Sequence, residues 1–241
     1  MLEARIFGNG KDFLHDHVDL RYVSRYMIAS TLAHEDARLP DRFTGLDWGQ
    51  LLQRAQNYEA GNDDPYGSPI PEQLSKNLLL FPAQTAVRKA VDTVLAEQLV
   101  HALLTTRVLE LYLNVAQFGP GLYGVCDAAW YYFGEPPDHM SWDDTYQLMG
   151  LLPGPENARR AHGGGIDVNP GTLQGRYTLG KINGARKYVP RELDANGGKT
   201  RDHLALASRL GVAGEASTQP DGPGSCRIMP GGVRARIKAE Q

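Results

Sequence analysis

The longest helical pattern in the chain lies between residues 86 and 104. Small and branched apolar residues recur there at intervals of three and four, which is the spacing of one face of an α-helix. Its members are Ala86, Val87, Ala90, Val91, Val94, Leu95, Leu99, Leu103 and Leu104. No series of strand–helix–strand units accompanies this run, so the sequence predicts a mainly α fold.

Prolines and capping residues divide the remaining chain into further helices. We expect helices near residues 18–39, 48–58, 71–80, 108–117, 122–133, 141–152 and 176–188. The length of 241 residues allows one sizeable core. We assign residues 1–16 to a polar N-terminal extension and residues 17–195 to one domain. Residues 196–241 are rich in Gly, Ser, Pro and charge, and we expect them to be mostly disordered.

Composition excludes some classes of protein. A formal net charge of −3 argues against a dedicated nucleic-acid binder. The two cysteines, Cys126 and Cys226, are too few for a disulfide framework. The N-terminus lacks the apolar core of a signal peptide, and no apolar run reaches the length of a membrane span. We therefore expect any membrane anchor to lie outside this chain or on another protein.

Two pairs of polar residues are candidates for chemistry, and each also fits an ordinary structural role. Glu35 and Asp36 close the first long helix, where a carboxylate acts either as a general base or as a solvated helix-end charge. Lys76 and Asn77 follow a loop and a helix start. They fit either a diphosphate or sugar site, or the polar outer face of an ordinary helix.

A third group consists of Arg88, Lys89 and Asp92. Arg88 and Asp92 are four residues apart, so they either line a cleft together or form a surface ion pair. The histidines show no metal-ligand spacing, and we assign no metal site. The run Trp130-Tyr131-Tyr132-Phe133 fits a packed core better than a base-stacking platform.

The segment Gly119-Pro120-Gly121-Leu122-Tyr123-Gly124 matches the glycine pattern of dinucleotide-binding loops. Two features argue against that function. Pro120 removes a backbone N–H from the loop, and no repeated strand–helix–strand units surround it. We interpret the match as coincidental.

Taken in order, the segments resemble the five motifs of the family 51 peptidoglycan glycosyltransferases. Residues 109–125, continuing through residues 128–134, resemble the fourth motif, and residues 148–155 resemble the fifth. The first motif matches residues 28–48, which include Glu35 and Asp36. The second matches residues 67–77 and the third residues 88–92. The resemblance covers about residues 17–190.

This resemblance implies a lysozyme-like helical catalytic lobe with a smaller membrane-facing jaw. It implies polymerisation of lipid II into a growing glycan strand, with inversion and loss of undecaprenyl diphosphate. Glu35 would be the base for the attacking sugar hydroxyl, and Asp92 a second catalytic carboxylate. The implied substrate-binding residues are Asp36, Ser68, Gln73, Lys76, Asn77, Arg88, Lys89, Glu110, Asn114, Gly119, Tyr123 and Gly124.

The family also implies a location and partners. No organic cofactor is implied, although a divalent cation, Mg or Mn, would assist the departure of the diphosphate. The expected place is the periplasmic side of the bacterial cytoplasmic membrane. Expected partners are the membrane surface and other cell-wall synthesis proteins.

Some positions depart from the family pattern. The first motif has one extra residue, with Leu39 and Arg42 in place of Phe and His. Pro69-Ile70-Pro71-Glu72-Gln73 stands where the family has Thr-Ile-Thr-Gln-Gln, Gln84 replaces an Arg, and Asp92 replaces a Glu. The charge near the diphosphate becomes more negative. Two alternatives therefore stay open: a weakened or inactive member that binds lipid II or glycan, and a lysozyme-like hydrolase.

Overall fold

The computed structural model describes residues 13–42, 68–79, 86–152, 154–212 and 214–241. The α-helices are α2 (Arg25–Glu35), α4 (Ile70–Leu79), α5 (Ala86–Ala102), α6 (Thr105–Val115), α7 (Val125–Ala128), α8 (Trp142–Leu151), α9 (Leu173–Asn196), α10 (Ala205–Arg209) and α11 (Gly231–Glu240). The strands are β1 (Gln117–Gly119), β2 (Leu122–Tyr123), β3 (Ala158–Arg160) and β4 (Ile166–Val168). The short helical turns are η1 (Leu20–Tyr22), η2 (Leu39–Asp41), η3 (Ala129–Phe133), η4 (Pro155–Asn157), η5 (Gly198–Thr200) and η6 (Ala216–Thr218).

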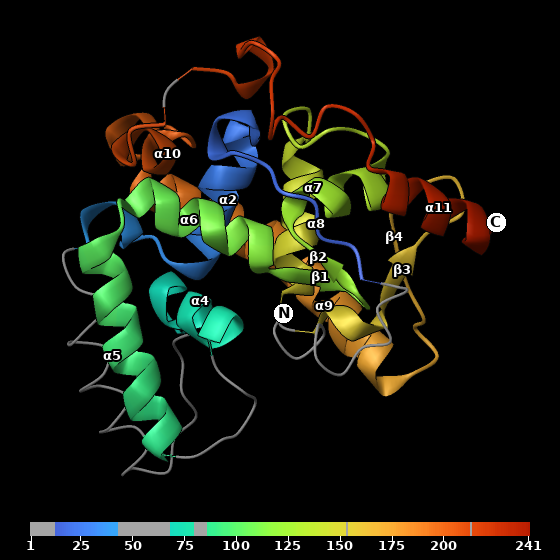
Figure 1. Cartoon of the computed structure of the whole chain (residues 1–241), viewed down its shortest axis with the longest axis horizontal. Coiled ribbons are helices and arrows are strands. Elements are labelled where there is room, and N and C mark those ends of the chain that lie inside the picture. Colours follow the sequence, from blue (N-terminus) through green and yellow to red (C-terminus); the bar gives the residue numbers. More distant parts are fainter. Residues whose placement is uncertain (1–12, 43–67, 80–85, 153, 213) are drawn as a thin grey trace.

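The described part of the chain is mainly helical, which confirms the predicted fold class (Figure 1). Helix α2 is its core element and packs against α8 and α9. Met27, Ile28 and Leu32 have no exposed surface. Most residues of α2 are buried, with Tyr26 as its exposed side chain, which is expected of a helix at the centre of a domain. The Ser24 side chain caps α2 by accepting a hydrogen bond from the Tyr26 amide.

Helices α8 and α9 form the closest helix pair. Gly150 lies where they cross, and a Cβ atom there would come within 2.4 Å of the Ile182 Cα. Only glycine permits this approach. The predicted capping box is confirmed, with Ser141 and Asp144 exchanging hydrogen bonds at the start of α8.

Helix α4 lies between α5 and α6, and α5 extends away from the larger helical body (Figure 1). The long apolar pattern of residues 86–104 therefore forms α5 and the turn that follows it. No helix among the described residues is long and apolar enough to cross a bilayer. The helix predicted for residues 48–58 lies outside the described residues.

Two short antiparallel hairpins accompany the helices. In the first, Pro120 and Gly121 join β1 to β2, and Gly121 in this turn and Gly124 after β2 take positive φ angles of 64° and 84°. An antiparallel hairpin differs from the strand–loop–helix of a dinucleotide site, in agreement with our rejection of that function. The helix predicted for residues 122–133 is shorter than expected, since its first residues form β2.

The prediction that residues 196–241 are mostly disordered is wrong. These residues form η5, α10, η6 and α11, and they run back across the molecule to lie beside the N-terminal segment (Figure 1). Cys126 and Cys226 form a disulfide that joins α7 to this C-terminal segment, with a Cα–Cα distance of 5.9 Å. Composition indicated disorder because few residues there are apolar, but Leu206, Leu210 and Val233 are buried in the core, and a cross-link and polar contacts hold the rest of the segment.

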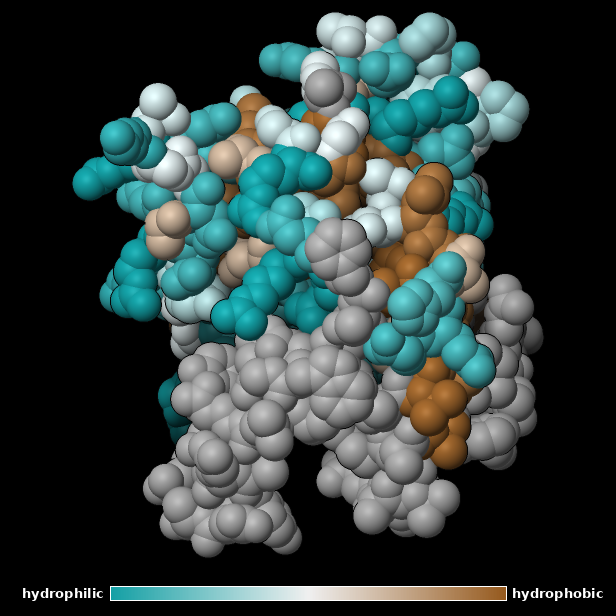
Figure 2. Space-filling view, turned by 90° about the vertical axis from the view of Figure 1, so that its left-hand side faces the viewer, coloured by the Kyte–Doolittle hydropathy of each residue, from teal (hydrophilic) through white to brown (hydrophobic). Residues whose placement is uncertain are grey.

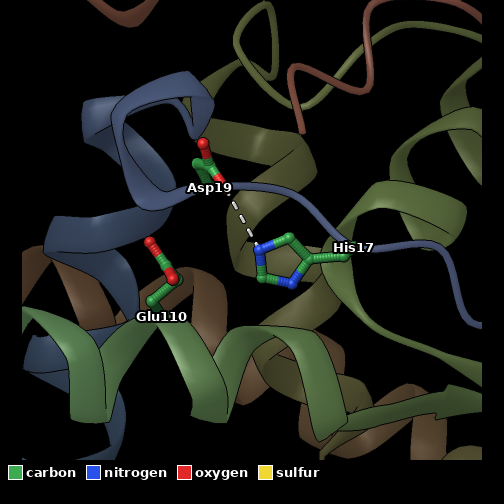
Figure 3. A group of neighbouring side chains, drawn as sticks. All are labelled: His17, Asp19 and Glu110. Carbon is green, nitrogen blue, oxygen red and sulfur yellow. Dashed lines mark hydrogen bonds and ion pairs between the residues drawn. The ribbon is translucent and has the colours of Figure 1, made fainter. Parts of the chain in front are cut away.

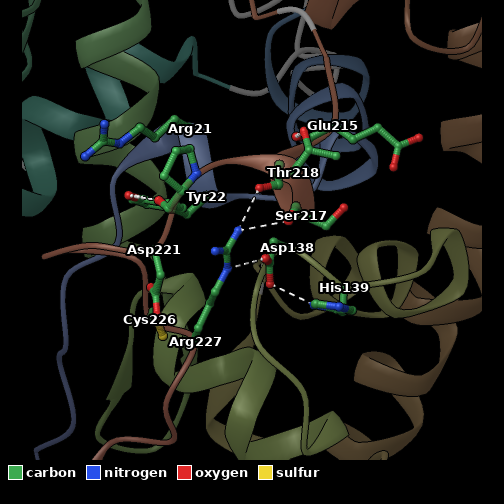
Figure 4. Close-up of polar contacts among 12 residues, drawn as sticks. Arg21, Tyr22, Asp138, His139, Glu215, Ser217, Thr218, Asp221, Cys226 and Arg227 are labelled. Atoms are coloured by element: carbon green, nitrogen blue, oxygen red, sulfur yellow. Dashed lines mark hydrogen bonds and ion pairs between the residues drawn. The ribbon is translucent and has the colours of Figure 1, made fainter.

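Arg227 is the centre of those polar contacts (Figure 4). Its Nε donates to the fully buried Asp138 carboxylate at 2.8 Å. Its terminal nitrogen donates to the carbonyl oxygens of Ala216 and Ser217 at 3.1 and 3.2 Å. One buried ion pair and two carbonyl contacts thus fold residues 216–227 onto the helical body.

Candidate active site

Glu35 is the last residue of α2, the buried central helix. The next residue, Asp36, leaves the helix with an extended φ of −162°. The Glu35 side chain is 12% exposed, so it stands at the end of the core helix with limited contact to solvent. This is the position that the sequence predicts for a base at a helix end.

Both oxygens of the Glu35 carboxylate are held. His34 Nδ1 lies 2.6 Å from Oε1, and Gln73 Nε2 donates to Oε2 at 2.7 Å. Gln73 also donates to the Ser68 carbonyl oxygen at 2.7 Å and accepts a hydrogen bond from Tyr112 Oη at 3.3 Å. The structure therefore brings Glu35, Gln73 and Ser68 together, as the sequence predicts.

Tyr112 is a site residue that the sequence motifs did not single out. It is buried on α6, and burial raises the pKa of its phenol well above the ordinary value, with the Glu35 charge adding to the effect. The Tyr112 hydroxyl therefore keeps its proton and serves as a neutral donor to Gln73. Three helices, α2, α4 and α6, thus converge on one carboxylate.

Lys76 and Asn77 follow Gln73 by three and four residues in α4, so all three lie on neighbouring positions of one helix face. Lys76 is exposed and Asn77 is partly exposed. Glu72, which we expected to add a negative charge near the diphosphate, is only 4% exposed and lies on the buried side of α4. The accessible charge on this part of α4 is thus the positive charge of Lys76.

Arg88, Lys89 and Asp92 lie within α5. Their side chains and all of Gln84 fall outside the described residues. The roles predicted for Arg88, Lys89 and Asp92 stay predictions.

Asp36 differs from its neighbour Glu35. Its side chain is 3% exposed, pairs with Arg42 at 2.5 Å, and accepts from the Ile70 amide at 3.2 Å. Burial raises the pKa of Asp36, while the Arg42 charge and these hydrogen bonds oppose that rise. Its oxygens bind the protein and join the end of α2 to the start of α4, and the predicted substrate contact of Asp36 stays a prediction.

Glu110 and Asn114 also bind the protein rather than an open cleft. Asn114 accepts from the Val18 amide at 2.8 Å and donates to the Val18 carbonyl oxygen at 2.9 Å. Glu110 Oε2 accepts from the Leu20 amide at 2.8 Å. These side chains hold the N-terminal segment against α6, and their predicted substrate contacts stay predictions.

The helical spacing explains this outcome. Glu110 and Asn114 are four residues apart and share one face of α6, whereas Tyr112 is about 200° around the helix from Glu110. The Tyr112 face meets Gln73 and Glu35. The other face meets residues 18–20.

The predicted residues of the glycine segment are structural as well. A Cβ atom on Gly119 would come within 2.7 Å of Tyr132 Oη, and one on Gly124 within 2.9 Å of the Asn114 carbonyl oxygen. Tyr123 is 8% exposed and packs against Phe13. These residues shape the β1–β2 hairpin beside α6.

Among the described residues, one group has the composition of a metal site: His17, Asp19 and Glu110, whose ligand atoms lie within 4.8 Å of one another. Figure 3 shows Glu110 rising from α6 toward His17 and Asp19, which already bond to each other. Asp19 also pairs with Arg21 and Glu110 with Arg107.

This group is on the side of α6 away from Tyr112 and Glu35. The described residues around Glu35 supply no comparable set of ligands. The divalent cation expected at the diphosphate stays a prediction.

A groove of about 510 Å³ runs along α9 beside the active site. It is lined by His34, Arg176, Tyr177, Gly180, Lys181, Gly184, Ala185 and Tyr188. Tyr177 and Tyr188 on this face of α9 are 53% and 44% exposed. Helix α9 packs its other side, which includes Ile182 and Val189, against the core.

The sequence model of the transglycosylase family matches residues 4–169 of this chain. The chain belongs to the transglycosylase family. It is 36% identical over 140 residues to a biosynthetic peptidoglycan transglycosylase of Shewanella frigidimarina. The aligned residues cover 58% of this chain and 62% of that relative. The chain is 40% identical over 141 residues to one of Alcanivorax borkumensis, covering 58% of this chain and 57% of that relative.

The chain thus spans about three fifths of the length of these relatives. Membership in the transglycosylase family agrees with the order of motifs in the sequence. It also agrees with the structure, in which the first and second motifs meet at the Glu35 carboxylate. A general base held in a shielded position, beside an exposed cation, suits the transfer of a sugar from a phosphate leaving group.

Proposed function

We propose that this chain is a peptidoglycan glycosyltransferase that polymerises lipid II into glycan strands. The observation that carries the proposal is the Glu35 carboxylate, held by His34 and Gln73 at the end of the core helix of a transglycosylase-family chain. Homologous proteins named as biosynthetic peptidoglycan transglycosylases support the same substrate class.

In the proposed reaction Glu35 accepts the proton of the 4-hydroxyl of the incoming sugar. That oxygen attacks the anomeric carbon of the growing strand from the face opposite the lipid diphosphate. The new carbon–oxygen bond forms as the bond to the diphosphate breaks, and the leaving group departs with the electron pair. Inversion at the anomeric carbon follows from this geometry.

The departing diphosphate is an anion and needs positive charge near it. Lys76 is exposed on the face of α4 that also carries Gln73. We assign Lys76 to the leaving group, with Arg88 and Lys89 of α5 as further predicted contacts. A divalent cation that assists from the substrate side, Mg or Mn, stays part of the proposal.

The proposed place of action is the outer face of a bacterial cytoplasmic membrane. The Cys126–Cys226 disulfide supports it, since structural disulfides persist in oxidising compartments. Apolar side chains on α5 support contact with a bilayer: Val91 is 41% and Val94 56% exposed, and Leu104 just beyond the helix is 79% exposed. Figure 2 views the side that carries α5, where hydrophobic patches lie next to hydrophilic ones.

The direct test is incubation of the purified protein with lipid II in detergent, with and without Mg²⁺ or Mn²⁺, and separation of the products on a gel. We expect a ladder of glycan strands from the wild type. Glu35→Gln should reduce the rate by roughly 10²- to 10⁴-fold, because a general base contributes a factor of that order. Glu156→Gln, at an exposed position on η4, is the matched control.

The outcomes separate the alternatives. If the wild type makes no polymer but binds lipid II as tightly as Glu35→Gln does, the chain is a binding protein of the cell-wall machinery and not an enzyme. Release of reducing ends from purified cell wall, without polymer from lipid II, would indicate a hydrolase.

A further inference from the structure

His34 and Glu35 are consecutive in α2, yet their side chains meet. Side chains of neighbouring helical residues point about 100° apart, so they do not ordinarily form a pair. Here the helix ends at Glu35, and the change of backbone direction at Asp36 lets the carboxylate turn back. The result is the 2.6 Å contact between His34 Nδ1 and Glu35 Oε1.

This contact is shielded from solvent. The His34 side chain is 18% exposed and that of Glu35 is 12% exposed. For comparison, His139 Nδ1 contacts Asp138 at 2.8 Å, but the His139 side chain is 57% exposed (Figure 4). A shielded hydrogen bond to a carboxylate is stronger and more directional than one at an open surface.

The His34 ring is itself held in place. Its plane stands edge-on to Tyr188 of α9, with ring centroids 6.0 Å apart and an interplanar angle of 86°. His34 also lines the groove along α9. The orientation of His34 is therefore set by packing and not by the carboxylate alone.

The hydrogen bonds leave room for chemistry. An ionised carboxylate has about four lone-pair sites, and His34 and Gln73 occupy one on each oxygen. A further site remains for the hydroxyl of an attacking sugar. With both oxygens held, the plane of the carboxylate is defined before substrate arrives, and defined orientation lowers the barrier to proton transfer.

We propose that His34 is a positioning residue for the proposed base: its Nδ1–H donates to Glu35 Oε1 and fixes the plane of the carboxylate. This inference rests on the proposed glycosyltransferase function. The inference requires a proton on Nδ1 of His34, which is present both in one tautomer of the neutral ring and in the charged ring. Gln73 supplies the matching donor on Oε2 from α4.

The test compares substitutions of His34 in the lipid II polymerisation assay. His34→Leu removes the donor, and we expect kcat to fall by about 10- to 100-fold with KM changed less than about twofold. His34→Asn places an amide nitrogen near the Nδ1 position and should recover most of the rate. His34→Gln carries its amide one bond further out and should remain slow.

Two controls separate positioning from stability. His139→Leu removes the histidine of the other His–Asp pair, which is 57% exposed and precedes α8, and should leave kcat unchanged. Thermal melting checks that each variant is folded. In a Glu35→Gln background, His34→Leu should add no further loss, because the group that it positions is already gone.

If His34→Leu keeps full kcat while the wild type is active and Glu35→Gln is inactive, the inference is wrong and the proposed function stands. Equal rates for the Asn and Gln variants would overturn the inference too, and that comparison decides the matter if His34→Leu does not fold. A wild type that makes no polymer would remove the proposed function and the inference together.

Discussion

Glu35 and Asp127 are both shielded from solvent, but their surroundings differ. Glu35 receives hydrogen bonds from two side chains. Asp127 has no exposed surface, and its Oδ2 accepts from the Asp16 amide at 2.6 Å, while its Oδ1 has no hydrogen-bond partner among the described residues. Burial raises the pKa of Asp127 to about 7, and the nearby Asp16 carboxylate adds to the rise.

This shift makes stability depend on pH. Between about pH 4 and pH 7 the folded protein keeps the Asp127 proton while the unfolded chain has lost it, so the folded state binds more protons. The free energy of unfolding therefore decreases as pH rises through this window. Above about pH 7 both states are ionised and the cost stays constant.

Asp127→Asn should remove that dependence. At pH 8 we expect an increase in the free energy of unfolding on the order of 1–2 kcal/mol, because the amide carries no buried charge. Urea titrations at pH 4, 6 and 8 would measure it, with Asp167→Asn at a partly exposed position of β4 as the control. A slope with pH equal to that of the wild type would refute this assignment.

At the scale of elements, helix ends and helix faces decide the role of each polar residue. Helix α2 presents Glu35 because it ends there, and α6 divides its polar residues between two faces. Helix α5 differs from both, since Val91 and Val94 are apolar and yet exposed. An apolar face on a helix that extends from the body fits a bilayer surface.

We therefore expect Val91→Ser/Val94→Ser to weaken binding to lipid vesicles. The two substitutions remove the hydrophobic contribution of two exposed side chains, and affinity for anionic phospholipid vesicles should fall by about 10-fold or more. Co-sedimentation with vesicles would measure the change. Leu173→Ser, at a position 71% exposed on α9, is the matched control, and an equal loss in that variant would contradict a specific role for α5.

At the scale of the whole molecule, the C-terminal segment closes the fold. The Cys126–Cys226 disulfide joins residues 100 positions apart in sequence. Tyr22 Oη donates to the Pro220 carbonyl oxygen at 2.8 Å, and Trp130 Nε1 donates to the Cys226 carbonyl oxygen at 2.8 Å. The end of the chain is thus tied to elements near its beginning and middle.

Cys126→Ser/Cys226→Ser should lower the free energy of unfolding by about 3–5 kcal/mol, because a cross-link that closes a loop of this length restricts the unfolded chain. Urea denaturation of the wild type and the double variant would measure the difference. Reduction of the wild type should reproduce it. An unchanged midpoint in both experiments would show that contacts such as Arg227–Asp138 hold the segment without the cross-link.

The sequence alone determined the helical fold class, the order of the motifs and the identity of Glu35 as the candidate base. Each of these conclusions depends on a local pattern. Periodicity, capping residues, prolines and short motifs each involve residues that are only a few helical turns apart in sequence. The capping box of Ser141 and Asp144 is an example, since its partners are three residues apart.

Only the tertiary structure decided which groups the polar side chains contact. Asp36, Glu110 and Asn114 have the side chains of ligand-binding residues, but their partners are the chain's own groups far away in sequence. Tyr112 contacts Gln73 of α4, and the His34 ring packs against Tyr188 of α9. Residues 196–241 are ordered although their composition indicates disorder, because one cross-link, one buried ion pair and buried apolar side chains such as Leu206 and Val233 join them to distant parts of the chain.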